Sequence, residues 1–238
     1  MSNLQGNEKR EYVGHMFSRI AQRYDFMNTI MTGGLHHRWR RNTAKEATVG
    51  LEGIALDVAT GTGDLALALA QMHAITSTIG IDLVPEMIKL ANAKISKRNC
   101  TNRISFVVGD ALALPFPDNT FACVTSGFSL RNLPDLRESL KQMIRVIKPG
   151  GRLVSLEIGT IENWLFKHLF EFYFNRVVPI VGTIIGNDKE AYTYLPNSVN
   201  YFPSAEVLAD SFREMGLHNV GYKRLGIGTP IIHWGTKE

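Results

Sequence analysis

Cysteine is scarce in this 238-residue sequence, which holds only Cys100 and Cys123. The two form no CxxC pair, so the sequence offers neither a disulfide framework nor a thiolate metal site, and we expect a reducing, cytoplasmic setting. The seven histidines are scattered, without the spacing to cysteines or acids that metal ligands show. We therefore expect no metal centre.

A long uncharged apolar run is also missing. The most apolar stretch, residues 164–185, is interrupted by Lys167, Glu171, Arg176 and Pro179, whereas a membrane span needs about 20 mostly uncharged residues. Two interpretations stay open for this stretch. It is either an amphipathic helix packed on a sheet, or a lid whose inner face holds an apolar substrate.

Acidic residues are fewer than basic ones, and the difference lies in one part of the chain. The formal net charge is +4, and the first fifty residues account for it. They carry eight basic residues (Lys9, Arg10, Arg19, Arg23, Arg38, Arg40, Arg41, Lys45) and four acids (Glu8, Glu11, Asp25, Glu46). Such a segment suits nucleic acid, an anionic membrane surface or simply a solvated helix face. No nucleic-acid-binding motif accompanies it, so we expect no nucleic-acid partner. Residues 1–12 are polar, and we expect no signal peptide.

Glycine and proline divide the chain into alternating short apolar runs and amphipathic segments. Strands are predicted at 54–58, 77–82, 104–109, 120–126, 151–157, 218–225 and 228–235. Helices are predicted at 8–24, 36–49, 64–72, 84–98, 134–147 and 204–215. The βαβ series predicts an α/β fold with a Rossmann-like, doubly wound, mostly parallel sheet, whose last two strands form an antiparallel edge.

Three of the predicted strands deliver an aspartate at their carboxyl end: Asp57, Asp82 and Asp110. Ligands of open α/β sheets bind outside the carboxyl ends of the strands, so these acids mark one rim of the sheet. A ligand with a ribose and a positive charge would use all three, whereas phosphates would be repelled by them.

A glycine-rich turn follows the first of these strands. Gly61-Thr62-Gly63 with Ala66 fits the G-x-G-x-x-A pattern, which alone is a weak signal for NAD or FAD. Asp57 stands just before the turn, where a pyrophosphate would pass, and no G-K-[ST] follows. S-adenosylmethionine, which has no phosphate and carries a sulfonium, suits the acids better.

Several strings resemble the ubiquinone/menaquinone biosynthesis C-methyltransferase family. The most selective is YDFMNTIMTGGLHHRW at 24–39, and the others are ALPFPDNTF at 113–121, LRN at 130–132 and RVIKPGGRLVSLE at 145–157. The resemblance runs over nearly the whole chain. The chain departs from the family pattern at Thr32 and Gly159, where serine is usual, and at Gly127, where many members place a cofactor-contacting serine.

The resemblance implies a class I methyltransferase that moves a methyl group from S-adenosylmethionine to a ring carbon of a polyprenylated quinol. A naphthoquinol is the favoured acceptor and a methoxy-benzoquinol the alternative. We expect residues 1–50 to form an N-terminal helical cap. Residues 51–238 are expected to form the methyltransferase domain, with a helical lid insertion at 161–202.

Roles for individual residues follow from this resemblance and from their chemistry. For the cofactor we predict Asp82 at the ribose diol, Asp110 and the Ala111 amide at the adenine, and Asp57, Gly61, Thr62 and Gly63 at the methionine end. The predicted catalytic residues are Arg131 and Asn132. Since a guanidinium is too basic to accept a proton, Arg131 is expected to lower the pKa of the quinol instead. Residues expected at the acceptor are Tyr24, Asp25, Asn28, His36, Tyr192 and Tyr194.

Alternatives remain open at this point. His36 is a second candidate for the proton acceptor, because histidine titrates near neutrality. The chain could methylate another hydrophobic acceptor, be an NAD-dependent oxidoreductase, or be a silent scaffold of quinone synthesis. Intact Gly61, Gly63, Asp82 and Arg131 argue against the scaffold. The expected partner is a polyprenylated quinol, and peripheral contact with the inner face of a membrane and a homodimer are left open.

Overall fold

A seven-stranded sheet forms the centre of the molecule, in the order β3-β2-β1-β4-β5-β7-β6. The computed structural model describes residues 5–97, 102–159, 168, 172–184, 186, 188–226 and 229–238. The strands are β1 (Gly53–Val58), β2 (Ile75–Asp82), β3 (Ile104–Val108), β4 (Phe121–Gly127), β5 (Ile147–Ile158), β6 (Leu217–Arg224) and β7 (Pro230–Lys237). Each overlaps its predicted range, and the predicted fold class is confirmed.

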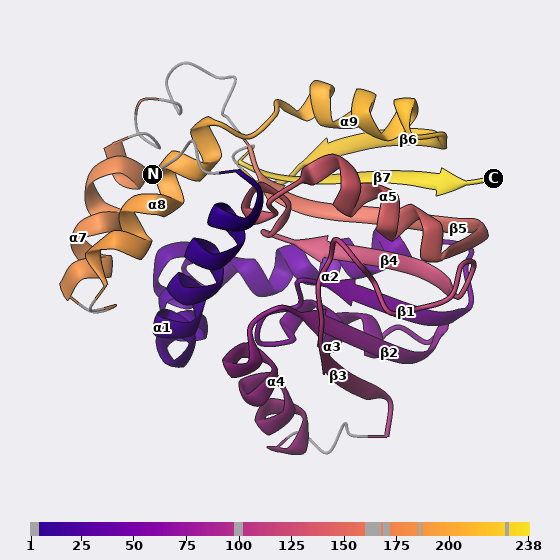
Figure 1. Ribbon diagram of the computed structural model, residues 1–238, viewed down its shortest axis with the longest axis horizontal. Coiled ribbons are helices and arrows are strands. Elements are labelled where there is room, and N and C mark those ends of the chain that lie inside the picture. Colours follow the sequence, from indigo (N-terminus) through magenta and orange to yellow (C-terminus); the bar gives the residue numbers. More distant parts are fainter. Residues whose placement is uncertain are drawn as a thin grey trace.

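The first five strands run parallel, and β7 is antiparallel to both β5 and β6. Strand β1 pairs with β2 on one side and with β4 on the other, so the direction of winding reverses there. Ligands of such sheets bind at this switch point, outside the carboxyl ends of the strands. Figure 1 shows helix α1 (Gly6–Thr32) standing at this edge of the sheet.

Both faces of the sheet are covered by helices, so successive strand residues enter two different cores. The helices are α2 (Leu35–Ala47), α3 (Asp64–Ala70), α4 (Pro85–Lys97), α5 (Leu136–Val146) and α9 (Ala205–Glu214), with a 3-10 turn η1 (Leu130–Asn132) after β4. Leu56 packs toward α5 and α9, with Leu140 and Phe212. Its neighbour Ala55 packs toward α2 and α3, with Ala44 and Leu69.

Helix α1 is longer than the predicted 8–24, and the threonines in its last two turns hydrogen-bond back to carbonyls of the preceding turn. Thr29 Oγ1 donates to the Asp25 carbonyl at 2.8 Å, and Thr32 Oγ1 donates to the Asn28 carbonyl at 2.7 Å. The helix ends at Gly33, whose φ of 57° is the left-handed conformation that favours glycine.

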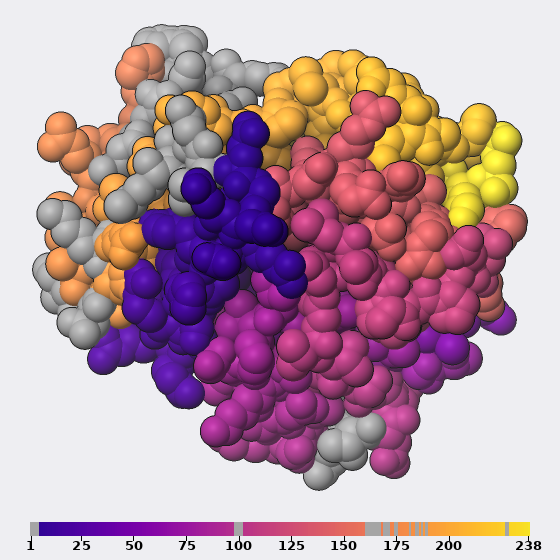
Figure 2. Space-filling view, in the orientation of Figure 1, coloured from indigo at the N-terminus to yellow at the C-terminus, as the bar shows by residue number. Residues whose placement is uncertain are grey.

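The described part of the predicted lid insertion packs against α1. It contains a π-helical turn η2 (Tyr173–Val177), α7 (Val178–Ile184) and α8 (Lys189–Asn200). Tyr192 and Tyr194 of α8 form a buried cluster with Met16, Ile20 and Met27 of α1. In Figure 2 the indigo N-terminal helix lies between this orange segment and the magenta sheet region. Much of the stretch 164–185 that raised the lid hypothesis, including Trp164, lies outside the described residues.

The N-terminal cap and the methyltransferase domain, with bounds at 50 and 51, stay a prediction. Across the part of the chain that the structure describes, no helix combines the length and apolar character that crossing a bilayer requires.

Candidate active site

A cavity opens at the switch point of the sheet. Its floor comes from the segments that follow β1 to β4, and α1 covers it. The lining residues used below are Arg10, Phe17, Tyr24, Gly61, Asp82, Asp110, Ala111, Phe128 and Asn132. Four of the seven residues predicted at the cofactor therefore border one cavity: Gly61, Asp82, Asp110 and Ala111.

Asp82, the last residue of β2, is buried at the floor of this cavity, and two backbone amides fix its carboxylate. Oδ2 accepts from Gly61 N at 2.7 Å, and Oδ1 accepts from Val84 N at 2.9 Å. Burial raises the pKa of Asp82, while these hydrogen bonds act in the opposite direction. Each carboxylate oxygen keeps acceptor capacity, which suits a pair of ribose hydroxyls.

Asp110, which follows β3, is held in a similar way at the rim. Its Oδ1 accepts from Leu112 N at 2.9 Å, and its Oδ2 pairs with Arg10 Nη2 of α1 at 2.9 Å. The cation that lines this cavity is thus already matched by a carboxylate. The side-chain oxygen of Asn132 is buried there without a hydrogen-bond partner among the described residues.

S-adenosylmethionine fits this arrangement. Asp82, Asp110 and the Asn132 oxygen present acceptors, which suit a ligand rich in hydroxyl and amino donors. A pyrophosphate would instead face two carboxylates. The residues present therefore favour a nucleoside-like, positively charged ligand over a dinucleotide.

Asp57, Thr62 and Gly63 support the turn and are not among the residues that line the cavity. Asp57 is fully buried and accepts from Thr60 Oγ1 at 2.5 Å and from Thr125 Oγ1 at 2.7 Å, which ties β1 to β4. Burial raises its pKa to about 6. Gly63 has a φ of 81°, and a Cβ there would lie 2.4 Å from Cζ of the Phe106 ring. Contact of these three residues with the cofactor stays a prediction.

The glycine-rich turn at residues 61–63 is also joined to helix α1. Thr62 Oγ1 donates to Asp25 Oδ1 at 2.5 Å, and Lys94 of α4 pairs with Asp25 at 2.7 Å and with Asp64 at 2.6 Å. Asp25, predicted at the acceptor, is therefore occupied in joining α1 to the glycine turn. It lines neither cavity of the site.

A second cavity lies beside the first. Phe17, Tyr24 and Phe128 border both cavities, so the two cavities meet at these three rings. The second cavity is further lined by Asn28, Met31, Thr32, His36, Trp39, Arg40, Arg131, Ile158, Tyr173, Val178, Leu195, Thr229 and Pro230. The predicted Tyr24, Asn28, His36 and Arg131 thus come together, and the insertion supplies Tyr173, Val178 and Leu195.

Phe128, which borders both cavities, has a strained backbone conformation. Its φ is 60°, a backbone conformation that a bulky side chain rarely adopts. Trp39 packs edge-on against its ring with 6.3 Å between centroids, and the Arg40 guanidinium lies 5.6 Å from the ring centroid. Strain that the surroundings maintain in this way is typical of functional sites.

Arg131 of η1 reaches the second cavity, whereas its neighbour Asn132 borders the first. Arg131 Nη1 pairs with Glu157 Oε2 at 2.5 Å, and Leu130 N donates to Glu157 Oε1 at 2.7 Å, with both side chains buried. Arg131 Nε is buried and has no partner among the described residues. Glu157 therefore orients the guanidinium through Nη1 and leaves further N–H donors, Nε among them, for a ligand.

His36 is buried and both of its ring nitrogens are engaged. Arg40 Nη1 contacts Nδ1, and Nε2 lies 3.2 Å from Thr29 Oγ1, whose own proton goes to the Asp25 carbonyl. Burial, followed by the charge of Arg40, lowers the pKa of His36 to about 4. A neutral ring that accepts from an arginine has no lone pair left for a substrate proton, which disfavours His36 as the base.

His36, His37 and Asp64 also approach one another closely enough to bind a cation. Asp64 is already paired with Lys94 at 2.6 Å and lies 3.6 Å from Arg40 Nη1. These positive charges occupy the ligand atoms, and we assign no metal here.

Tyr192 and Tyr194 lie away from the second cavity. Tyr192 packs against Gly182 and Gly186 of the insertion. Tyr194 packs on the ring of Tyr12 with 5.7 Å between centroids, and it lines a separate groove on the other side of Arg131. Their contact with the acceptor stays a prediction without support from this geometry.

Among the site residues that sequence reasoning missed, three fix its geometry and charge: Arg40, Phe128 and Glu157. Each lies in or beside a string that carried the family resemblance, and Arg40 directly follows the string at 24–39. A signal was therefore present in the sequence, but only the packing gives these residues a role.

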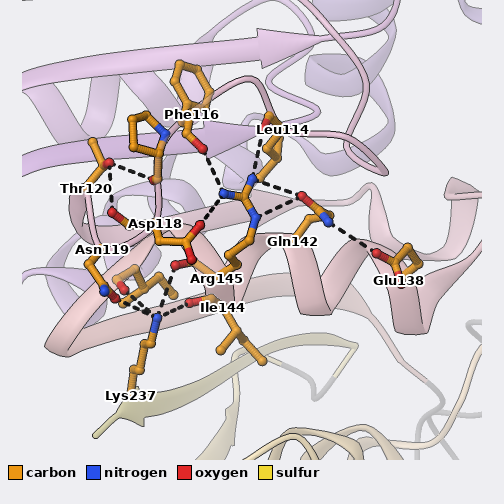
Figure 3. Close-up of polar contacts among 12 residues, drawn as sticks. Leu114, Phe116, Asp118, Asn119, Thr120, Glu138, Gln142, Ile144, Arg145 and Lys237 are labelled. Atoms are coloured by element: carbon orange, nitrogen blue, oxygen red, sulfur yellow. Dashed lines mark hydrogen bonds and ion pairs between the residues drawn. The ribbon is translucent and has the colours of Figure 1, made fainter.

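One string of the family resemblance has a structural part to play instead. Arg145 of α5 donates to the carbonyls of Leu114 at 2.9 Å and Phe116 at 2.8 Å, and it pairs with Asp118 at 2.6 Å. Figure 3 shows the guanidinium at the centre of this cluster. It fixes the segment that follows Asp110 and Ala111.

Comparison with known proteins agrees with this geometry. A family model described as the ubiE/COQ5 methyltransferase family matches residues 5–237. A protein of Roseiflexus castenholzii named demethylmenaquinone methyltransferase is 42% identical over 232 residues, which is 98% of this chain and 96% of that protein. One of Geobacter sulfurreducens, named ubiquinone/menaquinone biosynthesis C-methyltransferase, is 40% identical over 97% of this chain and 90% of that protein.

Among solved structures, an S-adenosylmethionine-dependent methyltransferase of Thermotoga maritima superposes with a TM-score of 0.65 at 20% identity. The match covers 95% of this chain and 100% of that one. At this level of identity the likeness concerns the fold.

Proposed function

The chain belongs to the ubiE/COQ5 methyltransferase family, and from that premise we propose that its acceptor is demethylmenaquinol, a naphthoquinol with a polyprenyl tail. As a member, it is an S-adenosylmethionine-dependent C-methyltransferase of quinone biosynthesis, which sets aside the oxidoreductase and scaffold alternatives. The relative of 42% identity named demethylmenaquinone methyltransferase supports the naphthoquinol over the methoxy-benzoquinol.

The observation that carries the proposal is the second cavity. It shares three aromatic walls with the cofactor cavity, it is lined largely by apolar side chains, and the guanidinium of Arg131 borders it with one unpartnered nitrogen. An aromatic ring with a hydroxyl group suits such a space. A quinol placed there lies next to the methyl donor, where the two cavities meet at the shared rings.

When bound, S-adenosylmethionine would supply an activated methyl group, which the ring carbon would take in line while the sulfur leaves as the neutral thioether of S-adenosylhomocysteine. We infer that Asp82 holds the ribose and that Asp110 with Ala111 holds the adenine, which fixes the donor. Arg131 Nε then donates to the ring oxygen beside the accepting carbon, and this stabilises the negative charge that makes the carbon nucleophilic. The ring hydrogen that the methyl replaces leaves as a proton. Holding both reactants in line supplies much of the acceleration.

The deciding experiment is transfer of a labelled methyl group to reduced demethylmenaquinone with a short prenyl tail, run beside a methoxy-benzoquinol with the same tail. We expect the naphthoquinol to give the higher kcat/KM. A preference for the benzoquinol would reverse the acceptor assignment, and labelling of neither would contradict the proposed function.

The proposal includes peripheral contact with an anionic membrane surface, where such an acceptor resides. It is supported by large exposed apolar residues at the corner between α1 and α2, where Phe26 is 59% and Leu35 51% exposed. Arg38 and Arg41 of α2 are exposed beside them. Phe26→Glu should reduce sedimentation with phosphatidylglycerol vesicles, whereas Val207→Glu on α9, also at an exposed site, should not. Equal sedimentation of the two variants would contradict this contact.

A further inference from the structure

The acceptor cavity is bordered by a second arginine whose charge is less fully matched than that of Arg131. Arg131 pairs with Glu157 at 2.5 Å. Arg40 of α2 lies 3.6 Å from Asp64, and Lys94 already holds that carboxylate at 2.6 Å. Lys94 also pairs with Asp25, and of these four side chains only Arg40 borders the cavity, so positive charge reaches the cavity from the side of α2.

The position of Arg40 is fixed, and most of its hydrogen-bonding capacity is unused. Its side chain is 8% exposed. Its guanidinium lies over the Phe128 ring, and its polar contacts with the described residues, to His36 Nδ1 and Asp64, both use Nη1. His36 is neutral, so its contact with Arg40 leaves the positive charge of Arg40 unchanged. A guanidinium fork held in this way is organised to donate from its remaining nitrogens.

The two arginines come from different elements, Arg131 from η1 beside the cofactor and Arg40 from α2. A hydroquinone carries two oxygens at opposite ends of its ring, and only the oxygen beside the accepting carbon takes part in activating it. We propose that Arg40 binds the other ring oxygen, so that the pair of arginines selects a hydroquinone over a monophenol. This inference rests on the proposed function and adds to it a residue that determines specificity.

The test compares two tailless acceptors under reducing conditions, 1,4-dihydroxynaphthalene and 1-naphthol. Both have a ring carbon beside a hydroxyl group, and only the first has the opposite oxygen. We expect wild type to favour the hydroquinone by about 30-fold or more in kcat/KM, because a site built around a hydroxyl rejects an analogue that lacks it. Arg40→Met should remove most of this preference by weakening the hydroquinone while leaving 1-naphthol within about threefold.

Arg41→Met is the matched control, since Arg41 lies on the same helix and is exposed. It should keep the wild-type ratio. Arg40→Lys keeps the charge without the planar fork and should give an intermediate ratio. Affinity for S-adenosylmethionine and the melting temperature, measured for each variant, identify a variant that fails to fold.

Three results would overturn the inference: an unchanged ratio in Arg40→Met, an equal loss with both acceptors, or no discrimination by wild type. Binding of the two acceptors in the presence of S-adenosylhomocysteine, followed by calorimetry, tests it without turnover. Wild type should bind the hydroquinone at least tenfold more tightly, and equal affinities would refute the role of Arg40. If wild type discriminates in binding but transfers no methyl, the proposed function fails and this inference stands.

Discussion

The two cavities share Phe17, Tyr24 and Phe128 as walls, yet their polar groups are of opposite charge. The cofactor side presents the carboxylates of Asp82 and Asp110. The acceptor side presents the guanidiniums of Arg40 and Arg131. A cationic methyl donor and an anionic acceptor each require the opposite charge, and both lose their charge as the methyl moves.

The largest effect on catalysis is expected in the acceptor cavity, when the guanidinium of Arg131 is removed. We expect Arg131→Ala to lower kcat by about 10²–10³, the usual cost of losing one oxyanion partner, while affinity for S-adenosylmethionine stays intact. Lysine should restore only part of the rate, because it lacks the planar fork. Activity of the alanine variant should also climb more steeply with pH, as measured by steady-state kinetics.

That variant leaves Glu157 buried without its cation, which commonly costs about 3–5 kcal/mol of stability. The double variant Arg131→Ala with Glu157→Gln removes both charges and separates chemistry from folding. A loss of less than fivefold in kcat, with an unchanged pH profile, would show that Arg131 does not stabilise the quinolate.

In the cofactor cavity, the largest loss of cofactor affinity is expected when the carboxylate of Asp82 is removed. We expect Asp82→Ala to weaken S-adenosylmethionine at least tenfold, about 1.4 kcal/mol, because two ribose hydroxyls lose their acceptor. Calorimetry measures this directly. The control is Asp210→Ala on α9, whose side chain is 56% exposed. Unchanged affinity in Asp82→Ala would remove this residue from the ribose site.

The two cavities also differ in how far they could be predicted. Asp82 and Asp110 each follow a strand, and hydrophobic periodicity locates strand ends, so their place at the rim could be derived from the sequence. The acceptor cavity draws on α1, α2, η1 and the insertion, which only tertiary packing brings together. Arg40 belongs to a helix whose sequence pattern does not reveal which face it buries, and it was overlooked for that reason.

Asp57 shows the opposite limit of this reasoning. Its position near the end of β1 predicts a ligand contact just as the position of Asp82 at the end of β2 does. Two threonine hydroxyls also donate to its carboxylate, and such a pairing is invisible until β1 and β4 are placed side by side, so its contact with a ligand stays a prediction. Strand-end acids thus indicate the rim, and the packing decides which of them face a ligand.

The stability of the protein should depend on pH through Asp57 and His36, whose pKa values are shifted in opposite directions. Asp57 has its pKa raised to about 6 by burial, so between about pH 4 and 6 the native state binds more protons than the unfolded state. The free energy of unfolding then falls as pH rises through that window. His36 has its pKa lowered to about 4, so the unfolded state binds more protons between about pH 4 and 6.5, and the free energy of unfolding rises with pH.

Urea unfolding of Asp57→Asn, His36→Asn and wild type from pH 4 to 7 isolates the two contributions. Relative to wild type, Asp57→Asn should gain stability with rising pH and His36→Asn should lose it, each by at most about 1.4 kcal/mol per pH unit. Parallel curves for the three proteins would mean that neither group titrates differently on folding.

The smallest effect is expected where the acceptor cavity meets the insertion. Tyr173, Val178 and Leu195 line its apolar part, and a prenyl tail gains roughly 25 cal/mol per Å² of apolar surface that it buries. One or two prenyl units should therefore raise kcat/KM about fivefold over the bare ring, and mostly through KM, since tail binding is the same in the ground and transition states. Leu195→Ser should reduce this gain, whereas Val207→Ser, an exposed change on α9, should preserve it. Equal kcat/KM for tailed and tailless naphthoquinols would show that the insertion closes the fold without holding the tail, and Arg40 and Arg131 alone would then define the acceptor.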